Sequence, residues 1–219
     1  MFVVPVDSSN LSVPRLARIA RVCTTPLECQ PASGAEEDDA RLVRTLYENG
    51  HWSVFEHATM TFYIDGISRA CSLQLARHRH ISRTEMSQRY VTFTRVKDET
   101  DRMFLNRVCV LPEAYDSPKE QALCERALLR PLEAYREALE KYGMKPEDAR
   151  MLLPEAAKTR MYVTFNLRTL LELMEKRGTN RYAQKEIRDL VNAMWAQVPL
   201  DVWQILDPLV REGSKKNDQ

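Results

Sequence analysis

The sequence has no apolar run that approaches the roughly 20 residues a membrane-spanning helix needs. Its first ten residues, MFVVPVDSSN, lack the charged and apolar regions of a secretory signal peptide. Its five cysteines are an odd number without close pairs, which suits a reducing compartment better than a disulfide framework. We therefore expect a cytoplasmic protein that does not act at a membrane.

The sequence also lacks a G-x-G-x-x-G or Walker phosphate loop, so any nucleotide must be held in another way. The net charge is only +1, whereas a dedicated nucleic-acid binder is more often basic overall. The 219 residues, 44% apolar and 29% charged, have an ordinary globular composition. We expect one domain over residues 1–219, with a polar loop at 24–39 and a frayed tail at 212–219.

Periodicity predicts strands where apolar residues alternate and helices where they recur every three or four residues. Strands separated by helices, without regular βαβ spacing, indicate an α+β fold. Ser117 and Glu120 have the spacing of a capping box, and Pro131 is expected to kink the helix that follows. The predicted strands are 58–66, 89–95 and 158–165, and the predicted helices are 38–50, 67–79, 117–142, 146–153, 166–177 and 180–198.

One segment, RHRHISRTEMSQRY at 77–90, concentrates charge within this neutral chain. It holds five Arg or His residues in its first seven and one acid, Glu85. A metal site is a weak interpretation, because His78 and His80 diverge on a helix and no Cys or His cluster completes four ligands. A Ser-His triad is also weak, because Ser82 and Ser87 lack a G-x-S-x-G elbow.

Three interpretations of this segment remain. An arginine-rich RNA-binding loop usually carries mixed basic runs with little nearby core, whereas here the arginines are interleaved with Ser, Thr and Glu between core-forming elements. A salt-bridged surface loop is plausible on composition, because charge runs are usually solvated. A site for a small anionic ligand explains the mixture better, since Arg binds phosphate in bidentate fashion while Ser hydroxyls and loop N–H groups take the remaining oxygens.

The segment is similar to the signature of flavin-dependent thymidylate synthases of the ThyX type. The signature residues that stand in register are Arg77, His78, Arg79, Ser82, Glu85, Ser87 and Arg89. Further segments resemble the family in the family's order: ARIARV (17–22), NGHWSVFEH (49–57), EDARMLLP (147–154), FNLRTLLELMEKR (165–177) and AQKEIR (183–188).

The resemblance implies C5 methylation of dUMP, with methylenetetrahydrofolate as the one-carbon donor and reduction through FAD and NADPH. It also implies an α+β fold with a small twisted sheet flanked by helices, assembled as a homotetramer whose active sites lie between subunits. By motif position, FAD would contact Ser53, Arg77, His78, Arg79, Glu85, Asn166 and Arg168. The nucleotide would contact Gln74, Arg77, Glu85, Met86, Ser87, Gln88, Arg89, Arg150 and Arg177.

Two matched residues carry expected catalytic roles, and three positions depart from the family. His51 would lie where folate and flavin meet, and Arg177 matches the residue that stabilises negative charge as N3 of the uracil ionises. Glu172 stands at a flavin position usually held by His or Asn, and Cys23 stands where Ser is common. Thr84 replaces the usual Asn beside the nucleotide. The replacement is either neutral variation or a change whose extra room and hydroxyl admit the ribose of UMP as well as dUMP.

Overall fold

The structure is a computed structural model that describes residues 1–8, 10–111 and 117–217, with side chains described as far as residue 213. The chain divides into two compact units. The expectation of a single domain stays a prediction. Unit 1 is formed by Met1–Phe2, Asp65–Leu75 and Thr84–Met161, and unit 2 by Val3–Ile64, Ala76–Arg83 and Tyr162–Gln219.

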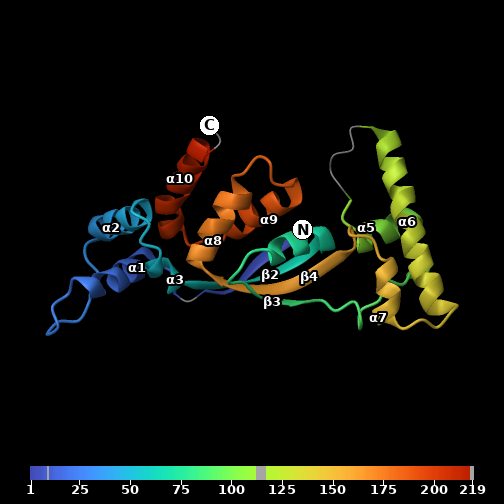
Figure 1. Cartoon of the computed structure of the whole chain (residues 1–219), viewed down its shortest axis with the longest axis horizontal. Helices are drawn as coiled ribbons and strands as arrows, with labels where there is room; N and C mark the ends of the chain where they lie inside the picture. Colours follow the sequence, from blue (N-terminus) through green and yellow to red (C-terminus); the bar gives the residue numbers. More distant parts are fainter. Residues whose placement is uncertain (9, 112–116, 218–219) are drawn as a thin grey trace. The chain divides into compact units, whose positions relative to one another are not determined.

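The described residues form one four-stranded sheet in the order β1-β2-β4-β3 (Figure 1). Its small size and its combination with many helices confirm the predicted α+β class. Pro5 lies in β1 and has no backbone N–H to donate, which an edge strand tolerates. The strands are β1 (Phe2–Ser8), β2 (Thr59–Ser68), β3 (Ser82–Glu85) and β4 (Lys158–Asn166).

Strands β2 and β4 pair in opposite directions. The hydroxyls of Thr61 and Thr164 are 3.0 Å apart, and two residues further the rings of Tyr63 and Tyr162 lie 5.2 Å apart between centroids. Because side chains alternate across a strand, the intervening residues point to the opposite, buried face. These buried residues are Met60, Phe62, Ile64, Met161, Val163 and Phe165, which confirms the alternation expected for both strands.

Unit 1 has its own apolar core, built around Phe104, Leu132 and Tyr135, which are fully buried. Figure 1 shows helices α5, α6 and α7 grouped together around this core. The expected capping box is confirmed, because Ser117 Oγ accepts from Glu120 N at 3.3 Å and Glu120 Oε2 accepts from Ser117 N at 3.0 Å. The helical elements are α4 (Arg69–Ala76), α5 (Asp101–Val108), α6 (Pro118–Glu140), α7 (Pro146–Ala149) and the 3₁₀ turn η2 (Arg150–Leu152).

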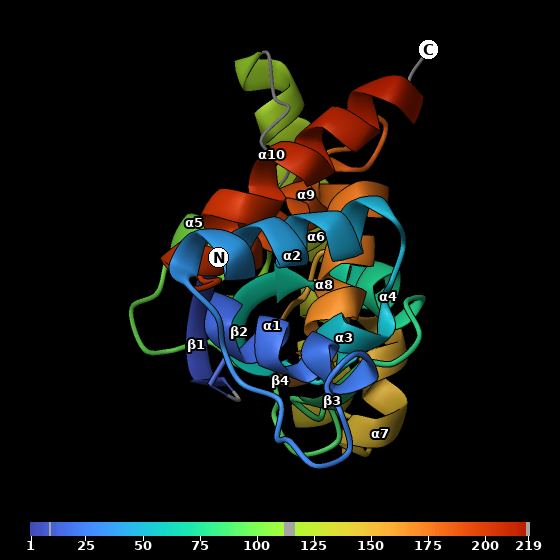
Figure 2. The ribbon, with the colours of Figure 1, turned by 90° about the vertical axis from the view of Figure 1, so that its left-hand side faces the viewer.

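Unit 2 contains the remaining helices of the described residues, and α1 and α2 pack side by side (Figure 2). No helix in the described ranges combines the length and the apolar character that crossing a membrane requires. The helical elements are α1 (Val13–Ala20), η1 (Arg21–Cys23), α2 (Glu36–Glu48), α3 (Ser53–Glu56), α8 (Leu167–Leu173), η3 (Met174–Gly178), α9 (Lys185–Trp195) and α10 (Leu200–Asn217).

The strand expected at 89–95 is wrong, because that segment is irregular. Its apolar side chains do not share one buried face, since Phe93 is buried while Tyr90 is 82% exposed. The strand of this region is β3, which lies inside the charged segment instead. The side chains of β3 are exposed or half-buried, so the strand leaves no apolar alternation in the sequence.

The boundaries expected for the polar loop and the tail also need correction. The loop ends at Ala35, because four acidic residues start α2, where they favour the positive end of the helix dipole. The last of them, Asp39, is fully buried and forms an ion pair with Arg21 at 2.5 Å. Residues 212–217 continue α10 rather than fraying, and residues 218–219 lie outside the described residues.

Two glycines should respond oppositely to alanine. Gly143 follows α6 with φ +62°, where a Cβ would touch no neighbour but the backbone would be strained, so Gly143→Ala should destabilise by about 1–2 kcal/mol. Gly213 lies inside α10 with equally open surroundings, so Gly213→Ala should stabilise by up to about 1 kcal/mol. Urea unfolding at one fixed protein concentration measures both, and midpoint shifts of the same sign would contradict this account.

Candidate functional site

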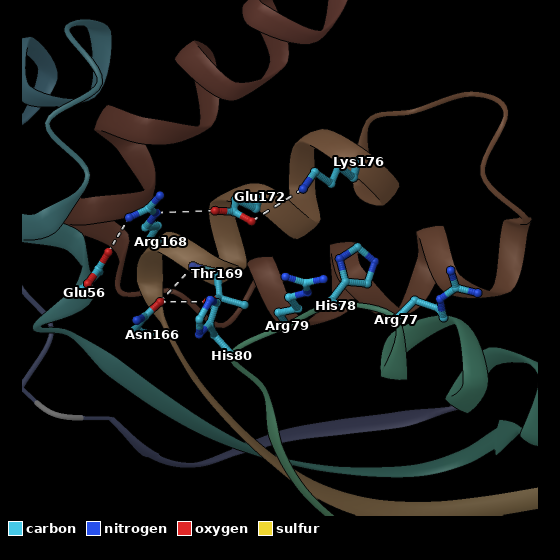
Figure 3. Close-up of a pocket in the computed structure, with 10 residues that line it drawn as sticks. All are labelled: Glu56, Arg77, His78, Arg79, His80, Asn166, Arg168, Thr169, Glu172 and Lys176. Carbon is cyan, nitrogen blue, oxygen red and sulfur yellow. Dashed lines mark hydrogen bonds and ion pairs between the residues drawn. The ribbon is translucent and has the colours of Figure 1, made fainter.

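Unit 2 contains a cavity of about 500 Å³ (Figure 3). Four of its lining side chains are Arg or Lys and two are Glu, which leaves an excess of two positive charges when the histidines are neutral. The cavity therefore suits an anionic ligand. The lining residues are Glu56, Arg77, His78, Arg79, His80, Asn166, Arg168, Thr169, Glu172 and Lys176.

The charged segment supplies one wall of this pocket. Helix α4 ends at Ala76, and the residues after it turn before β3 begins. His80 adopts φ 63°, in the left-handed region that a non-glycine residue occupies only at a cost. Figure 3 shows the side chains of residues 77–80 side by side, across the pocket from Glu172 and Lys176. The turn thus presents the motif side chains to the pocket.

The opposite wall is α8, whose start is fixed by a side-chain cap. Asn166 Oδ1 accepts from both Thr169 N and Thr169 Oγ1 at 2.9 Å. The backbone N–H of Leu167 donates to Ala58 O at 2.8 Å, which ties the first residue of α8 to the residue before β2. The helix therefore begins at a defined point beside the sheet, and Arg168 follows immediately.

A chain of ion pairs orders the cations on this wall. Arg168 pairs with Glu56 of α3 and with Glu172, one helical turn on, at 3.4 Å. Lys176 pairs with the other oxygen of Glu172 at 3.6 Å. All four side chains are more than a third exposed, so each pair contributes at most about 1 kcal/mol to stability. The pairs orient the cations and can give way to a ligand.

The helix expected to run to Arg177 changes type before its end. Residues Met174–Gly178 form a π-helical turn, closed by Thr179 N donating to Met174 O at 2.9 Å. Asn192 of α9 donates to Gly178 O at 2.8 Å and holds the turn from outside. A Cβ at Gly178 would lie 2.6 Å from Met174 Sδ, so any larger residue there would force the Met174 side chain to move. A π turn directs the Arg177 side chain differently from an α-helix.

Arg177 contacts the charged segment directly. Its Nε donates to His78 Nε2 at 3.2 Å. An imidazole nitrogen that accepts must carry a lone pair, so His78 is neutral with its proton on Nδ1. Partial burial lowers the pKa of His78, and Arg177 and Lys176 lower it further, while Glu172 opposes them. The described residues contain no group of three or more His, Cys, Asp or Glu side chains placed to hold a metal ion.

In unit 1 the carboxylate of Glu85 is held by three donors. Its Oε1 is 2.7 Å from the Arg69 guanidinium, 2.8 Å from Ser72 Oγ and 3.0 Å from Thr159 Oγ1. Arg69 also donates to Met86 O at 2.7 Å, so it fixes the backbone beside Glu85 as well. The start of the nucleotide segment expected at 84–89 is thereby tied to α4 and β4.

The end of that segment is tied to α7. Arg89 approaches the carboxylate of Glu147 through Nε at 3.1 Å and a terminal nitrogen at 2.9 Å. Arg150 donates from its Nε to the carbonyl of the same residue at 3.0 Å. Ser87 Oγ accepts from Arg89 N at 3.2 Å. The two arginines expected to bind phosphate therefore converge on one residue, whose carboxylate takes donors that a phosphate could use.

The structure places most of the sequence-predicted residues in two groups, one that lines the pocket and one in unit 1. His51 and Ser53 lie exposed before and at the start of α3 and do not line the pocket, whereas Arg177 reaches it through His78. The predicted residues that line the pocket are Arg77, His78, Arg79, Asn166, Arg168 and Glu172. Those in unit 1 are Gln74, Thr84, Glu85, Met86, Ser87, Gln88, Arg89 and Arg150.

Several residues of these sites were not singled out from the sequence. Glu56 and Lys176 lie inside segments that resemble the family, so their charge was an available signal. Arg69 and Ser72 are three residues apart and share one face of α4, a spacing that could have linked them. Thr159 carries no such signal, because only strand pairing brings it to Glu85.

Comparison with known proteins agrees with the motif resemblance. A family model described as "Thymidylate synthase complementing protein" matches residues 7–200. The flavin-dependent thymidylate synthase of Pyrococcus abyssi is 37% identical over 182 residues, covering 78% of this chain and 70% of the relative. The flavin-dependent thymidylate synthase of Geobacter sulfurreducens is 44% identical over 145 residues, covering 66% of this chain and 58% of the relative. These matches give no support to the RNA-binding interpretation.

Solved structures share the fold. Thymidylate synthase X from Helicobacter pylori, solved with FAD and dUMP, is 23% identical, covers 96% of this chain and 100% of its own, and has a TM-score of 0.77. PolB, a UMP/dUMP methylase from Streptomyces cacaoi solved with 5-Br UMP, is 25% identical and has a TM-score of 0.71. The match covers 96% of this chain and 95% of the PolB chain.

The close contact at the π turn gives a stability test. Gly178→Ala should destabilise the protein by about 1–3 kcal/mol, because the added Cβ overpacks against Met174 and Val191. Met174→Ala removes the nearest atoms, so Gly178→Ala should cost less in that background. Urea unfolding of the four proteins measures the coupling. Additive effects of the two changes would contradict the packing described here.

Proposed function

The chain belongs to the family of flavin-dependent thymidylate synthases, and from this membership we propose that it methylates C5 of dUMP. In the proposed reaction dUMP, methylenetetrahydrofolate, NADPH and one proton become dTMP, tetrahydrofolate and NADP⁺, which balances atoms and charge. FAD is the proposed resident cofactor. The observation that carries the proposal is the cationic pocket, where the family's signature residues meet α8 and η3.

The residues of the pocket fit the pyrophosphate of FAD by charge. The pyrophosphate of FAD carries two negative charges at neutral pH, which match the excess of two cations in the pocket. The volume of about 500 Å³ lies within the range of small-molecule sites. Arg77, Arg79 and Arg168 are the proposed phosphate donors, since guanidinium groups bind phosphate oxygens in pairs. Bound FAD supplies hydride transfer, and the protein supplies orientation and charge.

The nucleotide phosphate is assigned to Arg89 and Arg150. Arg89 already directs two nitrogens at the Glu147 carboxylate, a geometry that a phosphate could adopt in its place. The pair is about half exposed, so its loss costs little when a dianion replaces it. Glu85, held by its three donors, is the proposed acceptor for a sugar or base group of the same nucleotide.

Arg177 is the proposed electrostatic catalyst. Its guanidinium would stabilise the negative charge that develops as N3 of the uracil ionises, and such preorganised charge acts mainly in the transition state. Ser87 Oγ accepts from Arg89 N, and we propose Ser87 as a nucleotide contact rather than a covalent nucleophile. His51 lies exposed before α3. From the family resemblance we propose that it lies where folate and flavin meet.

UMP is a second candidate substrate. Thr84 stands exposed in β3 directly before Glu85, where its hydroxyl could meet the ribose 2′-OH of a nucleotide held by Glu85. A site that does not actively exclude a hydroxyl rejects it by only about 10². The similarity to PolB, which is named as a UMP/dUMP methylase, favours testing both uridylates. We propose dUMP as the main substrate, with UMP methylation measured beside it.

The same membership leads us to propose a homotetramer with active sites shared between subunits. Large apolar side chains are exposed on this chain, including Leu27, Tyr90 and Met151, and such groups often contact partner subunits. Light scattering measures the assembly, and an active monomer would contradict it.

The purified protein should be yellow and should convert dUMP to dTMP. Absorbance in the visible range and release of the cofactor on heating identify FAD. Mass spectrometry then follows the added methyl group on dUMP and on UMP, given separately with NADPH and methylenetetrahydrofolate. A colourless protein that cannot be reconstituted with FAD would overturn the cofactor assignment, and a flavoprotein that methylates neither uridylate would overturn the reaction.

Two arginine variants should separate binding from catalysis. Arg177→Ala should lower turnover by about 10²–10³ with flavin still bound, because its charge is needed mainly in the transition state. Arg168→Ala should instead lose flavin, because it removes a proposed phosphate donor. Flavin absorbance per subunit and turnover per bound flavin distinguish the two. If Arg177→Ala keeps turnover within a few-fold of wild type, its assigned role is wrong.

A further inference from the structure

The hydrogen bond between Arg177 and His78 joins residues that are 99 positions apart in the sequence. In the described part of the chain it is the one hydrogen bond or ion pair of the Arg177 side chain. It uses Nε, so the two terminal nitrogens of the guanidinium keep their donors for a ligand. The arginine is therefore anchored at one point, on the side away from the groups that would meet a substrate.

We propose that His78 is a positioning residue, whose Nε2 lone pair holds Arg177 in its working orientation and whose protonation releases it. This inference rests on the proposed function, in which Arg177 stabilises the ionised uracil. The physical reason is donor and acceptor matching. Neutral His78 accepts from Arg177, whereas doubly protonated His78 has only donors and carries a charge of the same sign.

The groups around His78 decide when release occurs. Arg177 and Lys176 of η3 and Glu172 of α8 act on it directly, and its other charged neighbours in the pocket are Glu56, Arg77, Arg79, His80 and Arg168. Burial and the positive charges of Arg177 and Lys176 lower the pKa of His78 below 6.5, and the negative charge of Glu172 opposes this shift. His78 therefore stays neutral at pH 7 and above and holds Arg177 there. As the pH falls through its depressed pKa, His78 gains a proton and the hydrogen bond is lost.

Turnover at saturating substrates, expressed per bound flavin, should distinguish the wild type from His78→Gln and His78→Leu. The wild type should lose turnover as the pH falls from 8 to 5. His78→Gln keeps an acceptor oxygen without a titrating group, so at pH 8 it should retain more turnover per bound flavin than His78→Leu, and it should lack that part of the acid limb. His78→Leu has no acceptor and should be lower than wild type at pH 8 by up to about 10²-fold, as expected when a catalytic group is misplaced by about 1 Å. The difference should shrink towards pH 5, where wild-type His78 has lost its acceptor too.

Two controls test whether the effect passes through Arg177. His57→Gln changes an exposed histidine that does not line the pocket, and it should keep the wild-type pH profile. In an Arg177→Ala background, His78→Leu should cause little further loss, because the group it positions is gone. Full additivity of the two losses, or an acid limb in His78→Gln equal to that of wild type, would overturn the proposal.

A measurement on the protein without substrates keeps this inference separate from the proposed function. NMR of protein with ¹⁵N-labelled histidine should show His78 neutral with its proton on Nδ1 at pH 7. Its pKa should rise in Arg177→Ala, because a neighbouring cation and its donated bond are removed. An unchanged His78 titration in that variant would overturn the pairing whatever the activity. A changed titration in a protein that methylates no uridylate would overturn the proposed reaction alone.

Discussion

The pairing of β2 with β4 is the constraint on which the pocket depends. The facing hydroxyls of Thr61 and Thr164 mark its register, and the bond from Leu167 N to Ala58 O extends it to the start of α8. A slip of one residue would turn every side chain of β4 to the opposite face. It would also move Arg168 away from Glu56. The position of the pocket's cations therefore follows from the register of two buried strands.

Both groups of candidate residues use acidic side chains to hold arginines ready. Glu56 and Glu172 hold Arg168, and Glu147 holds Arg89 in the other unit. Partly exposed pairs of this kind contribute little to stability, so a phosphate that binds more strongly can displace them. His78 does the same for Arg177 without a negative charge. That difference makes the Arg177 contact sensitive to pH where the carboxylate contacts are not, because a histidine changes charge near neutrality.

Features governed by neighbouring residues were predictable. The alternation of β2 and β4 and the Ser117 cap of α6 were visible because each depends on a few adjacent side chains. β3 was missed because its side chains are exposed or half-buried, and its pairing with β4 supplies what periodicity does not. The α10 helix (Leu200–Asn217) was not predicted, and its residues 212–217 were expected to be a tail, because a polar, charged stretch resembles one unless the preceding turns are already helical.

The sequence by itself determined the family and which residues carry charge to the site, because a signature of fixed spacing needs no tertiary information. It also determined that an anionic ligand was favoured, through the concentration of arginine in a neutral chain. Only the tertiary structure decided that η3 is a π turn, because that turn depends on Asn192 of α9 and on the space that Gly178 leaves for Met174. Only the tertiary structure brought Arg177 to His78, because a contact between residues so distant in sequence is set by packing and leaves no periodic trace in the chain.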